Sequence, residues 1–319
     1  MTEKSAFRPL SGSWLDFFHW QEEGKYFDSR LRAFTDSDWR GTVSGMADLG
    51  MKYIVLTSTA VVRPGRKEAY FRTDILPFPE DYVCRDPMSA VLSAADEKNM
   101  RVFVSCGWYG NMQKPWENMQ SPDVRRKAFR AMEQLRAVYG GHPSFFGWYL
   151  PDETAVSGLF EPFFIDYVNA YAAFGRSVFP EGKLLIAPYG TKTIRKDDRF
   201  VGQLESLDCD YIAYQDEVGV RKAKPEDAGK VFADLRTMHD RAGRSALWAD
   251  AELFDFEGDV YRSPLIPADA GRLAEQLKAL SPYADEILGY EYVGIMADGR
   301  ADTDSYRESY RKMIFTDVE

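Results

Sequence analysis

The sequence contains little cysteine, and this shortage argues against a disulfide-stabilised fold. Its 319 residues include three cysteines, an odd number that lie far apart: Cys84, Cys106 and Cys209. The N-terminal stretch MTEKSAFRPLSGSW also lacks the apolar segment of a signal peptide. We therefore expect reduced thiols and a cytoplasmic protein.

Histidine is equally scarce, with His19, His142 and His239 as its three copies. His142 precedes the fourth apolar run and His239 falls in a helical pattern, so imidazoles are too few for a transition-metal site. Long apolar runs and clusters of Lys and Arg are also missing. The first absence argues against a membrane span. The second, with a formal net charge of −10, argues against a nucleic-acid partner.

Short β-rich apolar runs are what the sequence has in abundance, in a composition that is 45% hydrophobic. Most are nearly continuous in hydrophobicity, which is typical of parallel strands covered on both faces. The eight runs span residues 11–18, 51–58, 101–108, 145–153, 183–190, 210–217, 245–253 and 286–295.

Helical patterns fill the gaps between these runs. The segments 86–99 and 121–141 both begin with a capping residue followed by proline, and 306–315 closes the chain as an eighth helix. Eight strand–helix alternations predict an α/β fold of the (β/α)8, or TIM, barrel class, with residues 1–319 as a single domain. A doubly wound open sheet is the alternative, but the first run leads into DFFHWQEEGKYF and not into a glycine-rich turn.

Acidic side chains follow most of the runs, at the ends that form the active-site face of a TIM barrel. Aromatic side chains occur at the same positions. Acids accept hydrogen bonds from sugar hydroxyls, aromatic faces stack on sugar C–H surfaces, and two acids can cleave a glycosidic bond. The sequence therefore predicts a site for a small carbohydrate. Its candidate residues are Asp16, Trp108, Tyr109, Asp152, Glu153, Tyr189, Tyr214, Asp216, Glu217, Asp250, Glu252 and Glu291.

Each candidate also has a purely structural interpretation. An acid after a strand is often the N-cap of the next helix, and Asp152 fits that role best because a helix could start near Thr154. Asp250 alternates with Glu252 along a strand, which would place it deeper as an orienting partner. Three tryptophans lie within apolar runs, so at least one should pack in the core: Trp14, Trp148 and Trp248.

The motifs GWYLPDE (147–153), YQDEVG (214–219) and LWADAELF (247–254) resemble those of glycoside-hydrolase-like TIM barrels. More narrowly, they are similar to a family of uncharacterised bacterial barrels, the domain of unknown function 4434, and the similarity spans nearly the whole chain by strand order. In the large retaining clan of the superfamily, strand four ends in Asn-Glu and strand seven ends in Glu. The resemblance implies Glu153 as general acid/base and Glu252 as nucleophile, without a cofactor.

One departure from that pattern bears on the mechanism. Asp152 stands where the clan has an asparagine that binds the sugar 2-hydroxyl, and an ionised Asp can accept but not donate a hydrogen bond. Carboxyl groups about 5–5.5 Å apart would indicate retention, and about 6.5–9.5 Å would indicate inversion. The sequence leaves this distance open, and Asp16, Asp216 or Glu217 remains an alternative second carboxylate. We expect a retaining hydrolase of oligosaccharides or glycosides.

Two other function classes stay open. A divalent-metal barrel enzyme would use an all-carboxylate Mg²⁺ or Ca²⁺ site at Asp216, Glu217 and Glu291. A non-catalytic sugar-binding barrel would carry the same acids and aromatics, because fold does not establish activity.

Two segments between the runs are expected to reach the mouth of the barrel. The loop after the first run offers His19 and Trp20. The long mixed segment 58–85 is expected to form a lid or a subsite, since loops of that length on a barrel usually do. Three of its basic residues are candidate substrate contacts: Arg63, Arg66 and Arg72.

Overall fold

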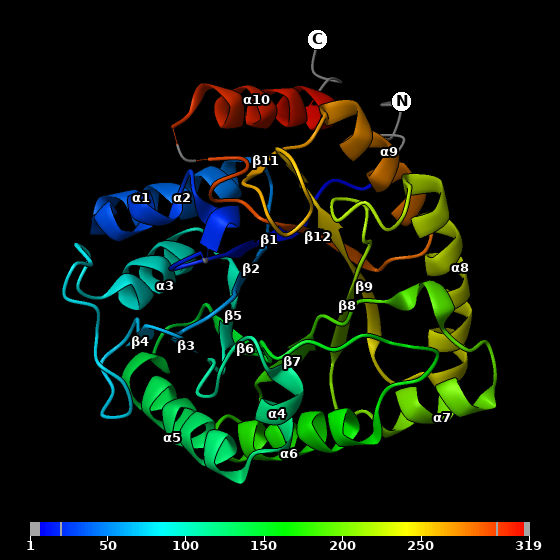
Figure 1. Ribbon diagram of the computed structural model, residues 1–319, viewed down its shortest axis with the longest axis horizontal. Coiled ribbons are helices and arrows are strands. Elements are labelled where there is room, and N and C mark those ends of the chain that lie inside the picture. Colours follow the sequence, from blue (N-terminus) through cyan, green and yellow to red (C-terminus); the bar gives the residue numbers. More distant parts are fainter. Residues whose placement is uncertain (1–6, 20, 298, 316–319) are drawn as a thin grey trace.

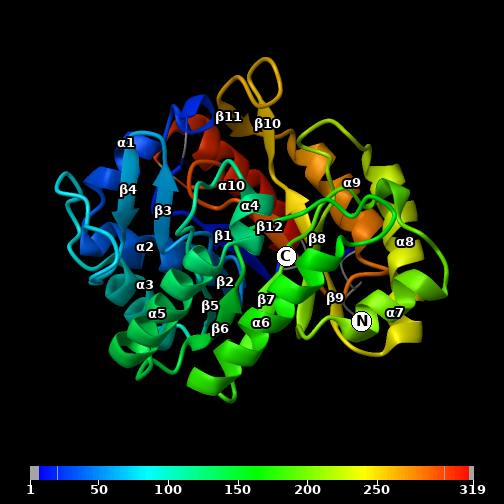
Figure 2. The same cartoon turned by 60° about the horizontal axis from the view of Figure 1, so that its bottom comes forward.

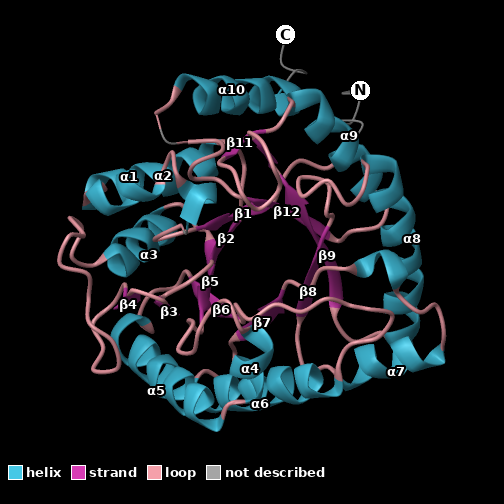
Figure 3. Cartoon of the chain, in the orientation of Figure 1, coloured by secondary structure: helices cyan, strands magenta, loops and turns pink. Residues whose placement is uncertain are grey.

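Eight parallel strands close into a barrel at the centre of the molecule, and helices surround it (Figures 1 and 3). The computed structural model describes residues 7–19, 21–297 and 299–315. The strands pair in the order β1-β12-β9-β8-β7-β6-β5-β2, and the first pairs with the last. The predicted single-domain (β/α)8 barrel is therefore confirmed. Its expected extension over residues 1–6 and 316–319 lies outside the described residues.

Each barrel strand begins close to the start of its predicted run but ends earlier. The last residues of each run leave the sheet and form the loops at the mouth of the barrel, which is why they mix apolar and acidic side chains. The barrel strands are β1 (Gly12–Leu15), β2 (Tyr53–Leu56), β5 (Arg101–Ser105), β6 (Phe145–Tyr149), β7 (Lys183–Ile186), β8 (Tyr211–Gln215), β9 (Ala246–Glu252) and β12 (Glu286–Tyr290).

Several helices begin where the sequence supplies a capping side chain. Ser121 precedes α5, and its Oγ accepts a hydrogen bond from the Val124 amide at 3.3 Å. Asp86 caps α3 in the same way, and both helices have proline in the first turn. The helices are α1 (Asp28–Ala33), α2 (Asp36–Asp48), α3 (Pro87–Glu97), α4 (Pro115–Gln120), α5 (Pro122–Tyr139), α6 (Pro162–Val178), α7 (Asp198–Ser206), α8 (Pro225–Ala242), α9 (Ala270–Leu280) and α10 (Ala301–Phe315), with 3₁₀ turns η1 (Gln21–Gly24) and η2 (Thr191–Thr193).

The suggested helix start near Thr154 is wrong. The chain runs on as a loop after β6, and α6 begins at Pro162 with Glu161 at its N-cap position. Asp152 therefore caps no helix. Its carboxylate instead accepts a hydrogen bond from Nδ2 of Asn118 on α4 at 3.1 Å, because both side chains are buried and need a polar partner.

Two β-hairpins extend from loops of the barrel. The segment 58–85 contains one of them, β3 (Ala60–Arg63) with β4 (Arg66–Ala69). The expected lid or subsite role of this segment stays a prediction, and none of its described residues lines the cavity at the barrel mouth. The second hairpin, β10 (Phe254–Phe256) with β11 (Leu265–Pro267), follows β9 and rises above the barrel in Figure 2.

The barrel interior is filled by its own aromatic cluster, separate from the core between strands and helices. Trp248 lies at its centre, with its ring 4.8 Å from that of Tyr53 and 4.3 Å from that of Tyr211. Trp14 belongs to the same cluster, whereas Trp148 packs outside the barrel. The expectation of a core role for at least one tryptophan is thus confirmed. Among the described residues, no helix combines the length and the apolar character that crossing a membrane requires.

Candidate functional site

A cavity of about 440 Å³ opens at the carboxyl ends of the barrel strands. Trp14 and Tyr290, from the upper layer of the barrel filling, contribute to its lining. Acids at the ends of four barrel strands, or in the loops that follow them, share the cavity wall, as expected for a parallel barrel whose strand ends all face one side. These acids are Asp16, Glu23, Glu153, Glu217, Asp250 and Glu252.

Glu153 follows β6 and is held by two donors. Tyr149 Oη donates to its Oε1 at 2.9 Å, and Gln215 Nε2 donates to its Oε2 at 2.7 Å. The surrounding protein removes water from the carboxyl group and raises its pKa to about 7, although the two hydrogen bonds oppose that shift. Glu153 can therefore carry a proton near neutral pH and can also release it.

Glu252 ends β9 on another side of the cavity. Val220 N donates to its Oε2 at 2.8 Å, and Gly219 allows this approach because a side chain there would collide with the Glu252 Cβ. The Glu252 amide in turn donates to Asp216 Oδ1 at 3.2 Å. Burial and the negative charge of Asp216 raise the pKa of Glu252 to about 8. The position of Glu252 is thus fixed from both its backbone and its side chain.

Asp250 lies two residues before Glu252 and faces the same way, one layer deeper. Burial, and then the charges of Glu252, Asp216 and Glu153, raise its pKa well above the usual range. Its Oδ1 accepts no hydrogen bond from the described parts of the chain. The geometry agrees with the expected deeper position, next to both candidate catalytic acids.

Aromatic and apolar side chains form the rest of the cavity wall. Trp108 and Tyr189 line it, as the sequence predicts. Lys222 Nζ lies 5.5 Å from the ring centre of Tyr189 and 5.7 Å from that of Tyr261, and 3.6 Å from Glu217 Oε1. The hairpin β10–β11 adds an apolar surface through Phe254, Phe256 and Leu265. The cavity wall therefore combines stacking surfaces with hydrogen-bonding acids.

Five of the expected contacts do not line this cavity: Tyr109, Asp152, Tyr214, Asp216 and Glu291. Side chains alternate between the two faces of a strand, so a residue next to an inward-facing one points to the helices. Tyr214 shows this, because its hydroxyl lies 3.1 Å from His239 Nε2 on α8. Asp216 Oδ2 likewise accepts from Gln276 Nε2 of α9 at 2.6 Å. Tyr214 and Asp216 therefore lie between the barrel and the surrounding helices, where they connect the strand to α8 and α9.

The suggested all-carboxylate metal site also fails on geometry. Asp216 is engaged by Gln276, and Glu217 pairs with Lys222. Glu291 instead lies beside Asp16 and His19, where burial and the charge of Asp16 raise its pKa to about 8. The three acids named from the sequence thus have different partners.

The loop expectations have mixed outcomes. His19 does line the cavity, while Trp20 lies outside the described residues. In the described parts of the chain, none of the three candidate arginines, Arg63, Arg66 and Arg72, lines the cavity, and Arg66 pairs with Glu68.

Sequence reasoning missed four side chains of the site: Tyr149, Gln215, Lys222 and Tyr261. Tyr149 and Gln215 lie on the inward faces of their strands, together with the side chains that fill the barrel. Because every second residue of a strand points to the same face, counting from an inward-facing residue of each strand could have identified them. Lys222 and Tyr261 come from irregular loops, and Tyr261 has a positive φ of 62°. No periodic pattern marks such positions.

Comparison with solved structures shows the same fold in several proteins with glycosidase names. A candidate alpha-L-fucosidase from Bacteroides thetaiotaomicron VPI-5482 superposes with a TM-score of 0.78 at 17% identity, over 98% of this chain and 94% of that one. An endo-1,4-beta-mannanase from Rhizomucor miehei gives 0.61 at 9% identity, over 97% and 93%. A beta-galactosidase from Halorubrum lacusprofundi gives 0.58 at 12% identity, over 98% and 58%.

At the level of sequence, no curated protein matches the chain. Residues 10–302 do match the family described as Domain of unknown function (DUF4434). This match covers all eight barrel strands and both candidate catalytic acids. The chain therefore belongs to the DUF4434 family.

Proposed function

We propose that this protein is a retaining glycosidase acting on oligosaccharides or glycosides, with Glu153 as general acid/base and Glu252 as nucleophile. One observation carries the proposal. The two carboxyl groups, from different barrel strands, line the same cavity together with Trp108 and Tyr189. The glycosidase names of proteins with this fold support the same class of reaction and a carbohydrate substrate.

In the first step, Glu153 gives its proton to the glycosidic oxygen while the ionised Glu252 attacks the anomeric carbon. Because the pKa of Glu252 is raised to about 8 and that of Glu153 to about 7, the reaction uses the form of the enzyme in which Glu153 holds the proton and Glu252 is ionised. The amide nitrogen of Gln215 can only donate, so it keeps Oε2 as an acceptor and places the acidic proton on Oε1. Val220 N donates a hydrogen bond to Oε2 of Glu252, so Oε1 is the oxygen that attacks. The glycosidic C–O bond breaks, the alcohol leaves with the proton, and a glycosyl ester forms on Glu252.

In the second step, the ionised Glu153 takes a proton from a water molecule. The water oxygen attacks the anomeric carbon and displaces the Glu252 carboxylate, which restores both groups. A pKa near 7 suits a group that must donate a proton in one step and accept one in the next. Two displacements at one carbon give net retention.

The test compares Glu153→Gln and Glu252→Gln with the wild type on a panel of aryl glycosides and oligosaccharides. A matched control is Glu97→Gln, since Glu97 pairs with Arg40 on the outer helices and is remote from the cavity lining. We expect turnover in the wild type and control and a loss of at least about 10³-fold in both variants. NMR detection of the first-formed anomer would then establish retention. Sugar binding by all four proteins without turnover would contradict the proposal and indicate a binding protein.

A further inference from the structure

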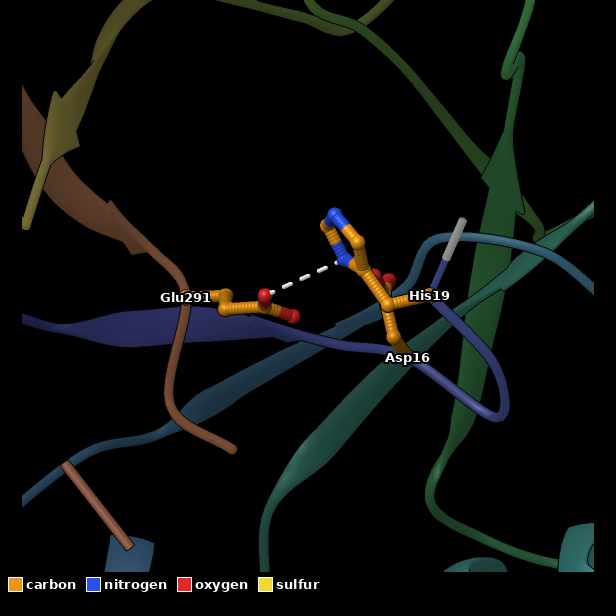
Figure 4. Close-up of side chains that lie close together, drawn as sticks. All are labelled: Asp16, His19 and Glu291. Atoms are coloured by element: carbon orange, nitrogen blue, oxygen red, sulfur yellow. Dashed lines mark hydrogen bonds and ion pairs between the residues drawn. The ribbon is translucent and has the colours of Figure 1, made fainter. Parts of the chain in front are cut away.

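Three side chains at one edge of the cavity form a compact group, shown in Figure 4. Asp16 and His19 follow β1, and Glu291 follows β12, so the closure of the barrel between its first and last strands brings them together. His19 Nδ1 lies 3.1 Å from Asp16 Oδ2 and 3.4 Å from Glu291 Oε1. Their ligand atoms all lie within 4.8 Å of one another, and each residue is at most 3% exposed.

Four polar atoms of this group lack a hydrogen-bond partner among the described residues. Within the described ranges, neither oxygen of Glu291 accepts a hydrogen bond, and Asp16 Oδ1 and His19 Nε2 make none. Glu291 is fully buried. Buried carboxylates are normally paired, hydrogen-bonded or bound to a metal, because leaving them unsatisfied costs several kcal/mol. A single imidazole shared among Asp16, Glu291 and the nearby Glu23 does not satisfy these oxygens.

The two distances from His19 Nδ1 to the carboxylates fit a metal ion, and the three donor atoms all lie within 4.8 Å of one another. Metal–nitrogen and metal–oxygen bonds of about 2.0–2.2 Å place neighbouring ligand atoms roughly 2.8–3.6 Å apart in octahedral or tetrahedral geometry. Both distances from His19 Nδ1 fall in that interval. One imidazole nitrogen with two carboxylates is a donor set for Zn²⁺ or Mn²⁺, whereas Ca²⁺ prefers six to eight oxygens.

The surrounding residues also suit ligands of a metal. Glu23 Oε2 lies 3.8 Å from His19 Nε2, where a carboxylate could orient the ring so that Nδ1 is free to coordinate. Tyr290 Oη donates to Asp16 Oδ2 at 3.2 Å. A divalent cation would balance the charges of Asp16 and Glu291.

We propose that Asp16, His19 and Glu291 bind one divalent transition-metal ion, Zn²⁺ or Mn²⁺, at the edge of the cavity. Asp16 and His19 line that cavity, so an open coordination position would face a bound ligand. The two-carboxylate reaction proposed above needs no metal. This site is therefore a separate property of the chain, and measuring it requires no turnover.

The experiment is titration of the chelator-treated full chain with Zn²⁺ and with Mn²⁺, followed by calorimetry and by metal analysis after dialysis. We expect one equivalent per chain. Asp16→Asn and Glu291→Gln should each weaken binding by at least about 100-fold. The control is His142→Gln, because His142 pairs with the single carboxylate of Asp96 at 2.6 Å and should leave binding unchanged.

A second measurement does not depend on the folding of any variant. Co²⁺ added to the wild type should give visible d–d absorption, and pulsed EPR of the Mn²⁺ form should show coupling to one imidazole nitrogen. Excess metal should also raise the melting temperature of the wild type. Absence of stoichiometric binding in the wild type would overturn the proposal. So would binding without imidazole coupling, or equal binding by Glu291→Gln.

Discussion

Gln215 Nε2 donates a 2.7 Å hydrogen bond to Glu153 Oε2, and so couples the end of β8 to the acid at the end of β6. The bond favours the ionised carboxylate and holds the pKa of Glu153 below the value that burial alone would produce. It therefore sets the upper pH limit at which Glu153 still carries a proton.

Gln215→Leu should move that limit upward. Removal of a hydrogen bond to a charged group costs about 1.5–3 kcal/mol, which corresponds to roughly one to two pH units in the pKa of Glu153. The alkaline limb of the kcat/KM profile should shift to higher pH by this amount. Tyr149→Phe removes the other donor and should shift the limb in the same direction. An unchanged limb in both variants would mean that Glu153 is not the acid.

Asp152→Asn should stabilise the protein, and more so at high pH. Burial raises the pKa of Asp152 to about 7, above its unfolded value of about 4. The folded state therefore binds the proton more tightly, and the Asp152 contribution to stability is lost as pH rises through this window. The gain from the substitution should be larger at pH 8 than at pH 5 by on the order of 2 kcal/mol, seen as a difference of several degrees in melting temperature.

The control is Asp96→Asn, for which the expected change in the free energy of unfolding has the opposite sign. Burial would raise the pKa of Asp96, but hydrogen bonds from His142 and Ser144 outweigh it and hold the pKa below its usual value. This contribution to stability is present at neutral pH and is lost on acidification. Asp96→Asn should therefore destabilise the protein at pH 7. If both variants respond alike, local ionisation is not the cause.

Trp108→Ala should weaken substrate binding more than it slows the chemistry. Trp108 lines the cavity and offers a large stacking surface, and an aromatic contact of this kind contributes about 0.5–1.5 kcal/mol. We expect KM to rise several-fold, up to about 10-fold, with a smaller change in kcat. Trp116→Ala is the matched control, since Trp116 is 48% exposed and packs on Phe163 outside the cavity lining. A similar rise in KM for both variants would point to a general loss of structure.

Tyr214→Phe should lower stability without altering KM. His239 Nδ1 lies 3.0 Å from the Ser245 carbonyl oxygen and carries the hydrogen, so the Tyr214 hydroxyl donates to Nε2. Burial lowers the pKa of His239 to about 4, which keeps the ring neutral. Loss of the donor leaves a buried nitrogen unsatisfied, at a cost of about 1–3 kcal/mol in the free energy of unfolding. A rise in KM at full stability would restore Tyr214 as a substrate contact.

The fold was predictable from the sequence because buried parallel strands leave continuous apolar runs. The position of the acids was predictable for the same reason, since runs end where the barrel opens. What the runs did not reveal was which of two adjacent polar residues faces inward. Asp152 and Glu153 differ by one position, yet Asn118 holds the first outside the cavity and Tyr149 holds the second inside it.

Long-range partners were harder to predict than strand positions. The group of Asp16, His19 and Glu291 joins residues 275 positions apart in sequence, a proximity that only barrel closure creates. The number of histidines argued against a transition metal, and the site proposed above would need only one imidazole because its other two ligands are carboxylates. Lys222 and Tyr261 depend on loop conformations that carry no periodic pattern.

The β10–β11 hairpin has a consequence for how this scaffold can diversify. Its two strands begin and end where Phe254 pairs with Pro267. Arg221 donates hydrogen bonds to the Asp255 carboxylate and to the Phe256 carbonyl oxygen of β10. The length of chain between residues 256 and 265 can therefore change without moving any barrel strand. Evolution, or a designer, could exchange this short insert to change which ligands enter the cavity while Glu153 and Glu252 stay in place.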